Sequence, residues 1–261
     1  MAVVSVPLVE FEKVSLAFKG VKALSDISFS VNEGELFAII GPNGAGKTSA
    51  FNCLNGVYKP QEGDVRWRGE SIMGMRPDRV AGLGIARTFQ NIELFAHMTV
   101  LENIALGRHV RTKVGWLSGA VWWGKARREE IANRAKVEDI IDLLEIEAWR
   151  FYPVGMLPYG IQKRVELGRA IAMEPELLLL DEPVAGMNLE ETEDMARFIL
   201  DIREELGIST ILVEHDMGLV MDIADRIMVL DFGEVIAIGT PEEIQRDENV
   251  IKAYLGEELD V

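Results

Sequence analysis

The stretch that decides the fold is "ELFAIIGPNGAGKTSAFNCLNGV", residues 35–57. Leu36 to Ile40 form a short apolar run of the kind that makes a buried strand. Lys47 to Leu54 can continue as a helix until Asn55-Gly56 ends it. Three glycines lie between the two segments, so this stretch predicts a strand, a glycine loop and a helix.

The loop, from Gly41 to Thr48, fits the pattern G-x-x-x-x-G-K-[ST]. Small residues there let backbone N–H groups converge on phosphate oxygens at a helix N-terminus. Lys47 would add a positive charge, and the Thr48 hydroxyl would be a magnesium ligand. A glycine turn ahead of an ordinary core helix is the alternative, but the strand and helix context favours phosphate binding. The expected nucleotide-binding residues are Gly41, Pro42, Asn43, Gly44, Ala45, Gly46, Lys47, Thr48 and Ser49.

A phosphate loop needs a second strand end that can hold a metal ion. The stretch "PELLLLDEP", residues 175–183, supplies one. Leu177 to Leu180 are fully apolar, and Asp181 and Glu182 stand at the C-terminal end of that run. Asp181 would bind Mg²⁺ directly or through water, and Glu182 would orient and deprotonate an attacking water. Alternatively, the acidic pair merely ends a strand and caps the next element. A four-leucine strand paired with a phosphate loop favours the catalytic interpretation.

Composition excludes several other classes. The chain has 261 residues, with 27 Lys plus Arg against 43 Asp plus Glu, a net charge of −16. A field of that sign repels nucleic-acid phosphates, so DNA and RNA are not expected partners. Cys53 is the single cysteine and cannot form an internal disulfide. We find no signal peptide and no run of about 18 apolar residues, so we expect a cytoplasmic protein that meets membranes only peripherally.

The motifs and their order resemble the ATP-binding subunits of ABC transporters over essentially the whole chain. By that resemblance, Phe18 in "LAFKG" stacks on adenine, and Gln90 in "RTFQN" reaches the metal and the attacking water. The loop "AGMN", residues 185–188, would link two ATP sites through Asn188, and His215 in "ILVEHDM" would contact the γ-phosphate. ATP and Mg²⁺ are the implied cofactors.

Each of these residues also has a structural interpretation. Phe18 alone is more typical of a core or edge-strand aromatic, and Gln90 alone of a solvated loop. The order and spacing of the motifs favour the functional roles. His215 has a physical argument of its own, because it ends the expected strand "TILVEH" beside Glu214 and Asp216, at the sheet edge where α/β proteins place ligands.

The stretch "LPYGIQKR", residues 157–164, resembles the family's signature motif, Leu-Ser-Gly-Gly-Gln. The corresponding residues are Leu157, Gly160, Gln162 and Arg164, with Pro158 replacing the serine and Tyr159 the first glycine. By resemblance, the N-terminus of this helix offers N–H groups to the γ-phosphate held by another subunit. Pro158 removes a hydroxyl donor, and Asn188 stands where the family often has aspartate. Both differences predict an asymmetric pair of ATP sites.

The expected fold class is α/β: a P-loop NTPase core of ABC type with an N-terminal antiparallel β subdomain and a helical subdomain. We expect one ATP-binding domain over residues 1–261, its core at about 1–90 and 160–261 and its helical subdomain at about 91–159. The expected apolar face of that subdomain is Ile131, Ala135, Ile140, Ile141 and Leu144. A hairpin turning at Asp231 to Gly233 and a capping box from Thr240 to Glu243 are expected near the C-terminus.

One tryptophan-rich segment, "VGWLSGAVWWGKARREE", has two interpretations. Trp116, Trp122 and Trp123 beside basic residues suit a membrane interface. The net charge of −16 opposes an anionic surface, so we expect these tryptophans to pack against the Ile140 and Leu144 face instead.

Within the family, "RTFQNIELFAHMTVLENI", "LPYG", "EPVAGMN", "EHDMGLVM" and "AYLGEE" resemble the ATPase of branched-chain amino acid importers. This resemblance implies two membrane permease subunits, an extracytoplasmic binding protein and a second ATPase, with a heterodimer favoured over a homodimer. It also implies a peripheral position on the cytoplasmic face of the membrane. The alternatives are an importer of urea, short amides or other amino acids, and a soluble non-transport ABC ATPase. The last would usually show a coiled-coil insertion, a second cassette or basic surfaces, and the sequence has none.

Overall fold

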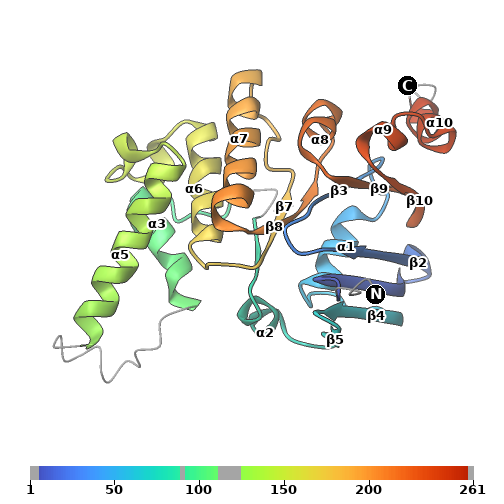
Figure 1. Cartoon of the computed structure of the whole chain (residues 1–261), viewed down its shortest axis with the longest axis horizontal. Helices are drawn as coiled ribbons and strands as arrows, with labels where there is room; N and C mark the ends of the chain where they lie inside the picture. Colours follow the sequence, from blue (N-terminus) through green and yellow to red (C-terminus); the bar gives the residue numbers. More distant parts are fainter. Residues whose placement is uncertain (1–5, 89–91, 111–124, 258–261) are drawn as a thin grey trace, which may run out of the picture.

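The computed structural model describes residues 6–88, 92–110 and 125–257, which form two sheets and the helices that cover them (Figure 1). An antiparallel sheet has the order β2-β1-β4-β5. A second sheet has the order β10-β9-β3-β8-β7-β6 and is parallel from β9 to β6. The strands of the two sheets are β1 (Val9–Phe18), β2 (Val21–Val31), β3 (Leu36–Ile40), β4 (Glu62–Trp67), β5 (Glu70–Ser71), β6 (Ile85–Arg87), β7 (Leu177–Asp181), β8 (Ser209–Val213), β9 (Arg226–Asp231) and β10 (Glu234–Gly239).

Both faces of the six-stranded sheet are buried, which explains the continuous apolar run of β7. Leu178 and Leu180 pack into the core formed with the helices. Leu177 and Leu179 point to the opposite face and pack into the core formed with the antiparallel sheet. Because successive side chains of a strand alternate between faces, a strand covered on both sides is apolar throughout.

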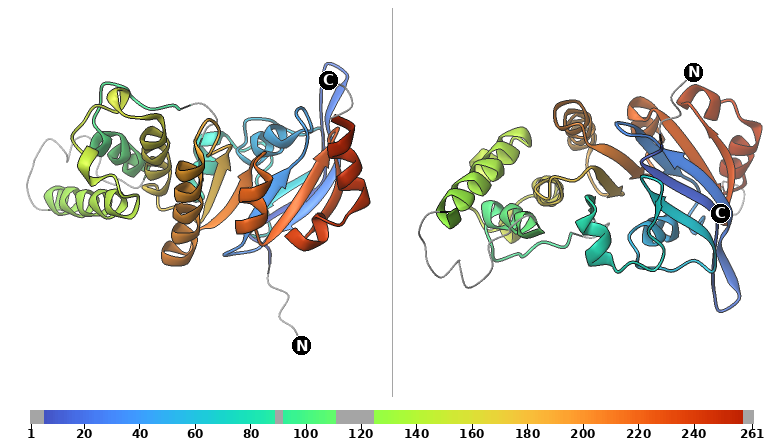
Figure 2. Two further views of the ribbon diagram at one scale, coloured as in Figure 1. Left: turned by 90° about the horizontal axis from the view of Figure 1, so that it is seen from above. Right: turned by 60° about the horizontal axis from the view of Figure 1, so that its bottom comes forward.

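The helices gather unevenly around this sheet. Figures 1 and 2 place α3, α5 and α6 at one end of the elongated molecule and the antiparallel sheet and α10 at the other. The helices are α1 (Lys47–Leu54), α2 (Pro77–Gly82), α3 (Val100–Gly107), α5 (Lys125–Leu143), α6 (Tyr159–Ile171), α7 (Leu189–Leu206), α8 (Met217–Ile223), α9 (Pro241–Ile244) and α10 (Glu248–Glu257), with 3₁₀ turns η1 (Arg108–Val110), η2 (Glu147–Trp149) and η3 (Val154–Met156). None of the helices that the structure describes is long and apolar enough to cross a bilayer.

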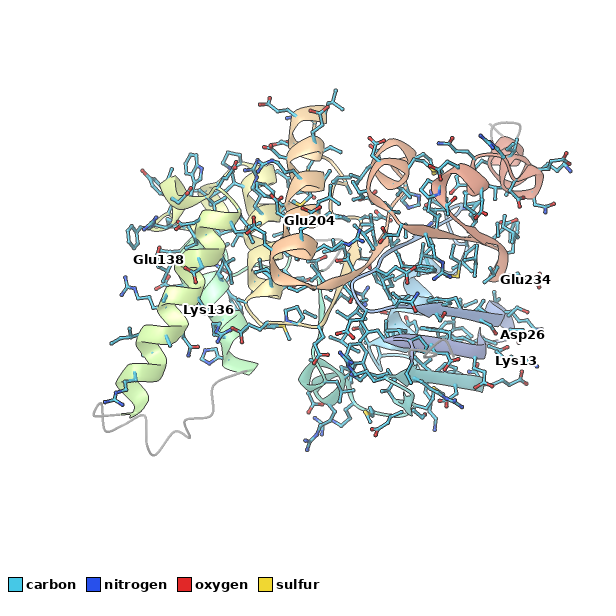
Figure 3. The ribbon with its side chains drawn as sticks, in the orientation of Figure 1. Lys13, Asp26, Lys136, Glu138, Glu204 and Glu234 are labelled. Carbon is cyan, nitrogen blue, oxygen red and sulfur yellow. The ribbon has the colours of Figure 1, made fainter. Side chains whose placement is uncertain are left out.

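Many charged side chains of the described chain lie on its surface. In Figure 3, Lys136 and Glu138 stand on α5, Glu204 on α7 and Glu234 on β10, all away from the sheet cores.

Several sequence predictions are confirmed, and one is partly wrong. The strand Leu36–Ile40, the helix Lys47–Leu54, the hairpin at Asp231 to Gly233 and the capping box at Thr240 are all present.

The predicted apolar face of α5 is the partial error. Ile140, Ile141 and Leu144 are buried, but Ile131 is 59% exposed and Ala135 is exposed. The first turns of α5 run beyond α6, so only the second half of the helix faces the core (Figure 1). The tryptophans of the segment before α5 lie outside the described residues, and their packing stays a prediction.

Candidate functional site

Three neighbouring parallel strands end at one edge of the sheet and bring the predicted residues together. β8 lies between β3 and β7, so the glycine loop, His215 and the pair Asp181–Glu182 follow adjacent strands. Ligands of α/β proteins bind at the carboxyl ends of such strands. A cavity of about 310 Å³ opens at this edge, lined by Ala23, Asn43, Gly44, Ala45, Gly46, Lys47, Thr48, Ser49, Glu182 and His215.

The glycine loop needs a glycine at position 41 because the backbone there lies directly against the C-terminal hairpin. Gly41 has a φ of 146°, and a Cβ there would lie 2.0 Å from the carbonyl oxygen of Leu230 on β9. The N–H of Gly233 donates to the carbonyl of Ala45 at 2.9 Å. A side chain at Gly41 would therefore push the loop away from its support.

Lys47 folds back over the loop it belongs to. Its side chain is largely buried, and its Nζ donates to the carbonyls of Gly41 at 2.6 Å and of Pro42 at 3.0 Å. These bonds hold the ammonium group beside the cavity, where a triphosphate would meet both the charge and the N–H groups at the start of α1.

Two of the residues expected to bind magnesium, Thr48 and Asp181, lie in the described chain. Asp181 has a hydrogen-bond partner, Arg87, that the sequence analysis missed. Arg87, which ends β6, donates from Nη2 to Oδ2 of the buried Asp181 at 2.6 Å and from Nη1 to Oδ1 of Asn52 at 2.7 Å. The Thr48 hydroxyl and the Asp181 carboxylate are hard oxygen ligands, which suit Mg²⁺. Gln90, the third expected ligand, lies outside the described residues.

Glu182 and His215 meet at the mouth of the cavity. Oε1 of Glu182 lies 2.9 Å from Nε2 of His215. Glu182 has a φ of 50°, an uncommon conformation for a residue with a Cβ, and its N–H donates to the carbonyl of Val213 at 2.9 Å. Strained backbone of this kind persists where surrounding contacts fix it, and it gathers at functional sites.

Phe18 is not among the residues that line this cavity. It ends β1, is 44% exposed, and makes an edge-to-face contact with Tyr58 at 4.9 Å between ring centroids. An exposed aromatic is available for stacking, and its role toward adenine stays a prediction.

None of the signature residues lines this cavity either. Pro158 is the N-cap of α6, and the ring of Tyr159 approaches Gly186 of the 185–188 loop.

One correspondence in the signature needs correction. Counted from Leu157, the fifth position of the motif is Ile161, which packs against the core, and Gln162 is one position later. The Gln162 amide donates to the carbonyl of Leu157 at 2.8 Å and so closes the first turn of the helix.

Asn188 has a local role at the start of α7. Its Oδ1 accepts the N–H of Glu191 at 3.0 Å, and Oε2 of Glu191 accepts the N–H of Asn188 at 3.0 Å. This is a capping box, in which asparagine and aspartate serve about equally well. Asparagine at this position therefore preserves the helix start.

Comparison with known proteins gives consistent similarities. The sequence profile of the ABC transporter family matches residues 24–185, and that of the branched-chain amino acid ATP-binding cassette transporters matches residues 234–260. BraF of Pseudomonas aeruginosa, a high-affinity branched-chain amino acid transport ATP-binding protein, is 39% identical over 96% of this chain and 98% of its own. LivG of Salmonella typhimurium, which carries the same description, is 41% identical over 97% of this chain and 99% of its own.

Solved structures agree with the sequence relatives. The ADP conformation of MJ1267, an ATP-binding cassette of an ABC transporter, superposes with a TM-score of 0.83 at 30% identity, over 96% of this chain and 99% of MJ1267. A nucleotide-free ATP-binding cassette from an ABC transporter gives a TM-score of 0.81 at 29% identity, over 95% of this chain and 98% of that one. These similarities confirm the expected fold and the resemblance that the motifs indicated.

Proposed function

This chain belongs to the ABC transporter family as an ATP-binding subunit, and from that premise we propose that it powers the import of branched-chain amino acids. The observation that carries the proposal is the similarity of this chain to LivG and BraF. The identity is 39% to 41% over almost the full length of this chain and of each relative. It would act from the cytoplasmic face of a membrane, bound there through permease subunits.

The arrangement of the site supports ATP hydrolysis. The glycine loop and Lys47 hold the triphosphate, and Thr48, Asp181 and Gln90 are the residues that would hold Mg²⁺. The bound ion would neutralise charge on the phosphates. Glu182 takes the proton of the attacking water, and the contact with His215 at 2.9 Å keeps its carboxylate at the reacting end of the cavity.

The second ATP-binding subunit is proposed to meet the start of α6. The signature residues Leu157, Pro158, Tyr159 and Gly160 do not line the chain's own cavity, which supports a role at the site of another subunit. Because Pro158 offers no hydroxyl, we propose that the two sites of the dimer hydrolyse ATP unequally. That argument favours a heterodimer of two similar ATPases.

The membrane subunits are proposed to dock on the helical subdomain, at about residues 91–159. Two of its segments run side by side there, with the N–H of Gly155 donating to the carbonyl of Ala96 at 2.9 Å. They expose large apolar side chains: Phe95 is 58% exposed, Tyr152 51% and Met156 76%. A group of exposed apolar residues supports a protein interface.

The test is ATP turnover by the transporter reassembled from this chain, its permeases and its binding protein in liposomes. We expect leucine, isoleucine or valine to stimulate hydrolysis and to accumulate inside, and Lys47→Ala to abolish both. If only urea or short amides stimulated hydrolysis, the chain would instead be the ATPase of a urea or amide importer. An ATP hydrolysis rate that is the same with and without the permeases would indicate a soluble ATPase.

A further inference from the structure

Glu214 is a buried carboxylate to which none of the recognised motifs assigns a role. It directly follows β8, is 3% exposed, and does not line the ATP cavity. Burying a carboxylate is unfavourable unless the protein supplies hydrogen bonds to it, so its partners indicate what it does.

Those partners come from two different loops. Oε1 of Glu214 accepts the N–H of Val184 at 3.1 Å, in the loop after β7. Oε2 accepts the N–H of His215 at 2.9 Å and, more weakly, that of Asp216 at 3.4 Å, in the loop after β8. One carboxylate therefore joins the main chains that carry Glu182 and His215.

The same two loops are joined a second time by side chains. Oε1 of Glu182 lies 2.9 Å from Nε2 of His215, and Glu182 is held at a φ of 50°. Glu182, Val184, Glu214 and His215 thus form a closed ring of main-chain links and hydrogen bonds. If the buried side of the ring opened, the strained turn at Glu182 would lose a restraint.

We propose that Glu214 is a positioning residue for hydrolysis, which fixes the two loops so that Glu182 and His215 face the reacting end of ATP. The inference rests on the proposed ATPase function. Glu214 has no contact with the cavity and acts only through the main chain of Val184 and His215.

Opposing influences act on the charge of Glu214, and together they raise its pKa. Burial raises the pKa of Glu214, the nearby Glu182 acts in the same direction, and the backbone N–H groups act in the opposite direction. Lys163 of α6 is also buried, and burial lowers its pKa, whereas Glu166, Glu214, Glu182 and Asp181 raise it. A buried ammonium among these carboxylates offsets part of their charge.

The test variant is Glu214→Gln, which keeps the shape but leaves only one acceptor oxygen. Whichever way the amide turns, one of the two loops faces an NH₂ group instead of an acceptor. We expect the single-turnover rate of the reassembled transporter at saturating Mg²⁺ and ATP to fall about 10- to 100-fold, because small displacements of reacting groups cost that much. The Kd for ATP should change less than about twofold, since the glycine loop is untouched.

A matched control is Glu35→Gln, the same change at a buried carboxylate on the other edge of the sheet. Oε2 of Glu35 accepts the N–H of Asn32 at 2.7 Å, and its Oε1 accepts from Arg226 at 2.9 Å. This variant should lower the melting temperature and leave the rate unchanged. A Glu214→Gln protein that behaves like Glu35→Gln, with lower melting and a normal rate, would overturn the inference.

A double-mutant cycle provides a second readout. In the Glu182→Gln background, Glu214→Gln should slow the reaction little further, because residues that act as a unit are strongly non-additive. If the rate reductions of the two single variants multiply in the double variant, Glu214 acts independently of Glu182, and the inference would fail. Absence of hydrolysis by the wild-type chain in the reassembled transporter would overturn the proposed function and this inference together, whereas normal turnover in Glu214→Gln would overturn the inference alone.

Discussion

Oε1 of Glu182 lies 2.9 Å from Nε2 of His215, although the two residues are 33 positions apart in the chain. The contact exists because β7 and β8 are parallel neighbours, with Asp181 in register with Val213. Each strand delivers one residue past the sheet edge. With a proton on Nε2, His215 donates a hydrogen bond to Oε1 of Glu182.

Replacing Glu182 with glutamine should separate binding from chemistry. The amide keeps the size of the side chain but is a poor base, and loss of a general base typically costs about 10²- to 10⁴-fold in rate. Glu182→Gln should therefore bind ATP and accumulate as an ATP-bound dimer that hydrolyses very slowly. Single-turnover release of labelled phosphate is the measurement, and near-normal release would contradict the assignment of Glu182.

Replacing Pro158 with serine should raise hydrolysis in the assembled transporter. Serine is a preferred N-cap residue, and its hydroxyl would add a hydrogen bond to a charged phosphate, worth roughly 1.5 to 3 kcal/mol. Pro158→Ala is the control, because it removes the ring without adding the hydroxyl. Steady-state ATPase rates of the three proteins decide the matter, and equal rates for serine and alanine would count against the proposed asymmetry.

The two loop glycines Gly41 and Gly44 should differ in their tolerance of alanine. Both have positive φ, but a Cβ at Gly41 would meet the Leu230 carbonyl oxygen at 2.0 Å, while nothing lies within 4 Å of one at Gly44. Overpacking adds about 1 to 3 kcal/mol to the backbone strain that both variants share. Urea unfolding of the nucleotide-free proteins should therefore show Gly41→Ala as the less stable. Equal midpoints would mean that the loop is not pressed against β9.

The single thiol should be unreactive in the native protein. Burial raises the pKa of Cys53 from 9.0 to about 12, so the thiolate that attacks labelling reagents is scarce at pH 8. We expect slow labelling of the native chain and rapid labelling in denaturant. Fast native labelling that leaves the melting temperature unchanged would place Cys53 at the surface.

The same shift predicts a pH dependence of stability. The folded pKa lies above the unfolded one, so this contribution is complete below pH 9 and is lost as the pH rises toward 12. Within that window, the free energy of unfolding should fall by up to about 1.4 kcal/mol per pH unit from this group. Cys53→Ala should have a shallower slope than the wild type, and identical slopes would contradict the shift.

The site was predictable from sequence where the signal is local. The run Leu36–Ile40, the glycine pattern and the helix from Lys47 are consecutive in the chain, so their conformations follow from neighbouring residues. The pair Asp181–Glu182 was found because β7 is buried on both faces and therefore reads as unbroken leucine.

Features that depend on pairing of distant strands were missed. The ion pair between Arg87 and Asp181 requires β6 to lie beside β7, and nothing near Arg87 in the sequence indicates that pairing. The ring through Glu214 depends in the same way on β7 and β8. The prediction for Ile131 was wrong because helical periodicity indicates which face of a helix is apolar. It does not indicate how much of the helix length is covered by other elements.

The hydrogen bond from Gly233 to Ala45 has a consequence for the order of events during protein synthesis. Within the part of the chain that the structure describes, the strand before the phosphate loop, β3, pairs with β8 and β9, and the loop contacts the hairpin of β9 and β10. About 190 residues separate Ala45 from Gly233, which at translation rates of about 5 to 20 residues per second is a delay of roughly 10 to 40 s. A nascent chain therefore emerges with its loop unsupported, and it becomes competent to capture nucleotide only when most of the polypeptide has left the ribosome.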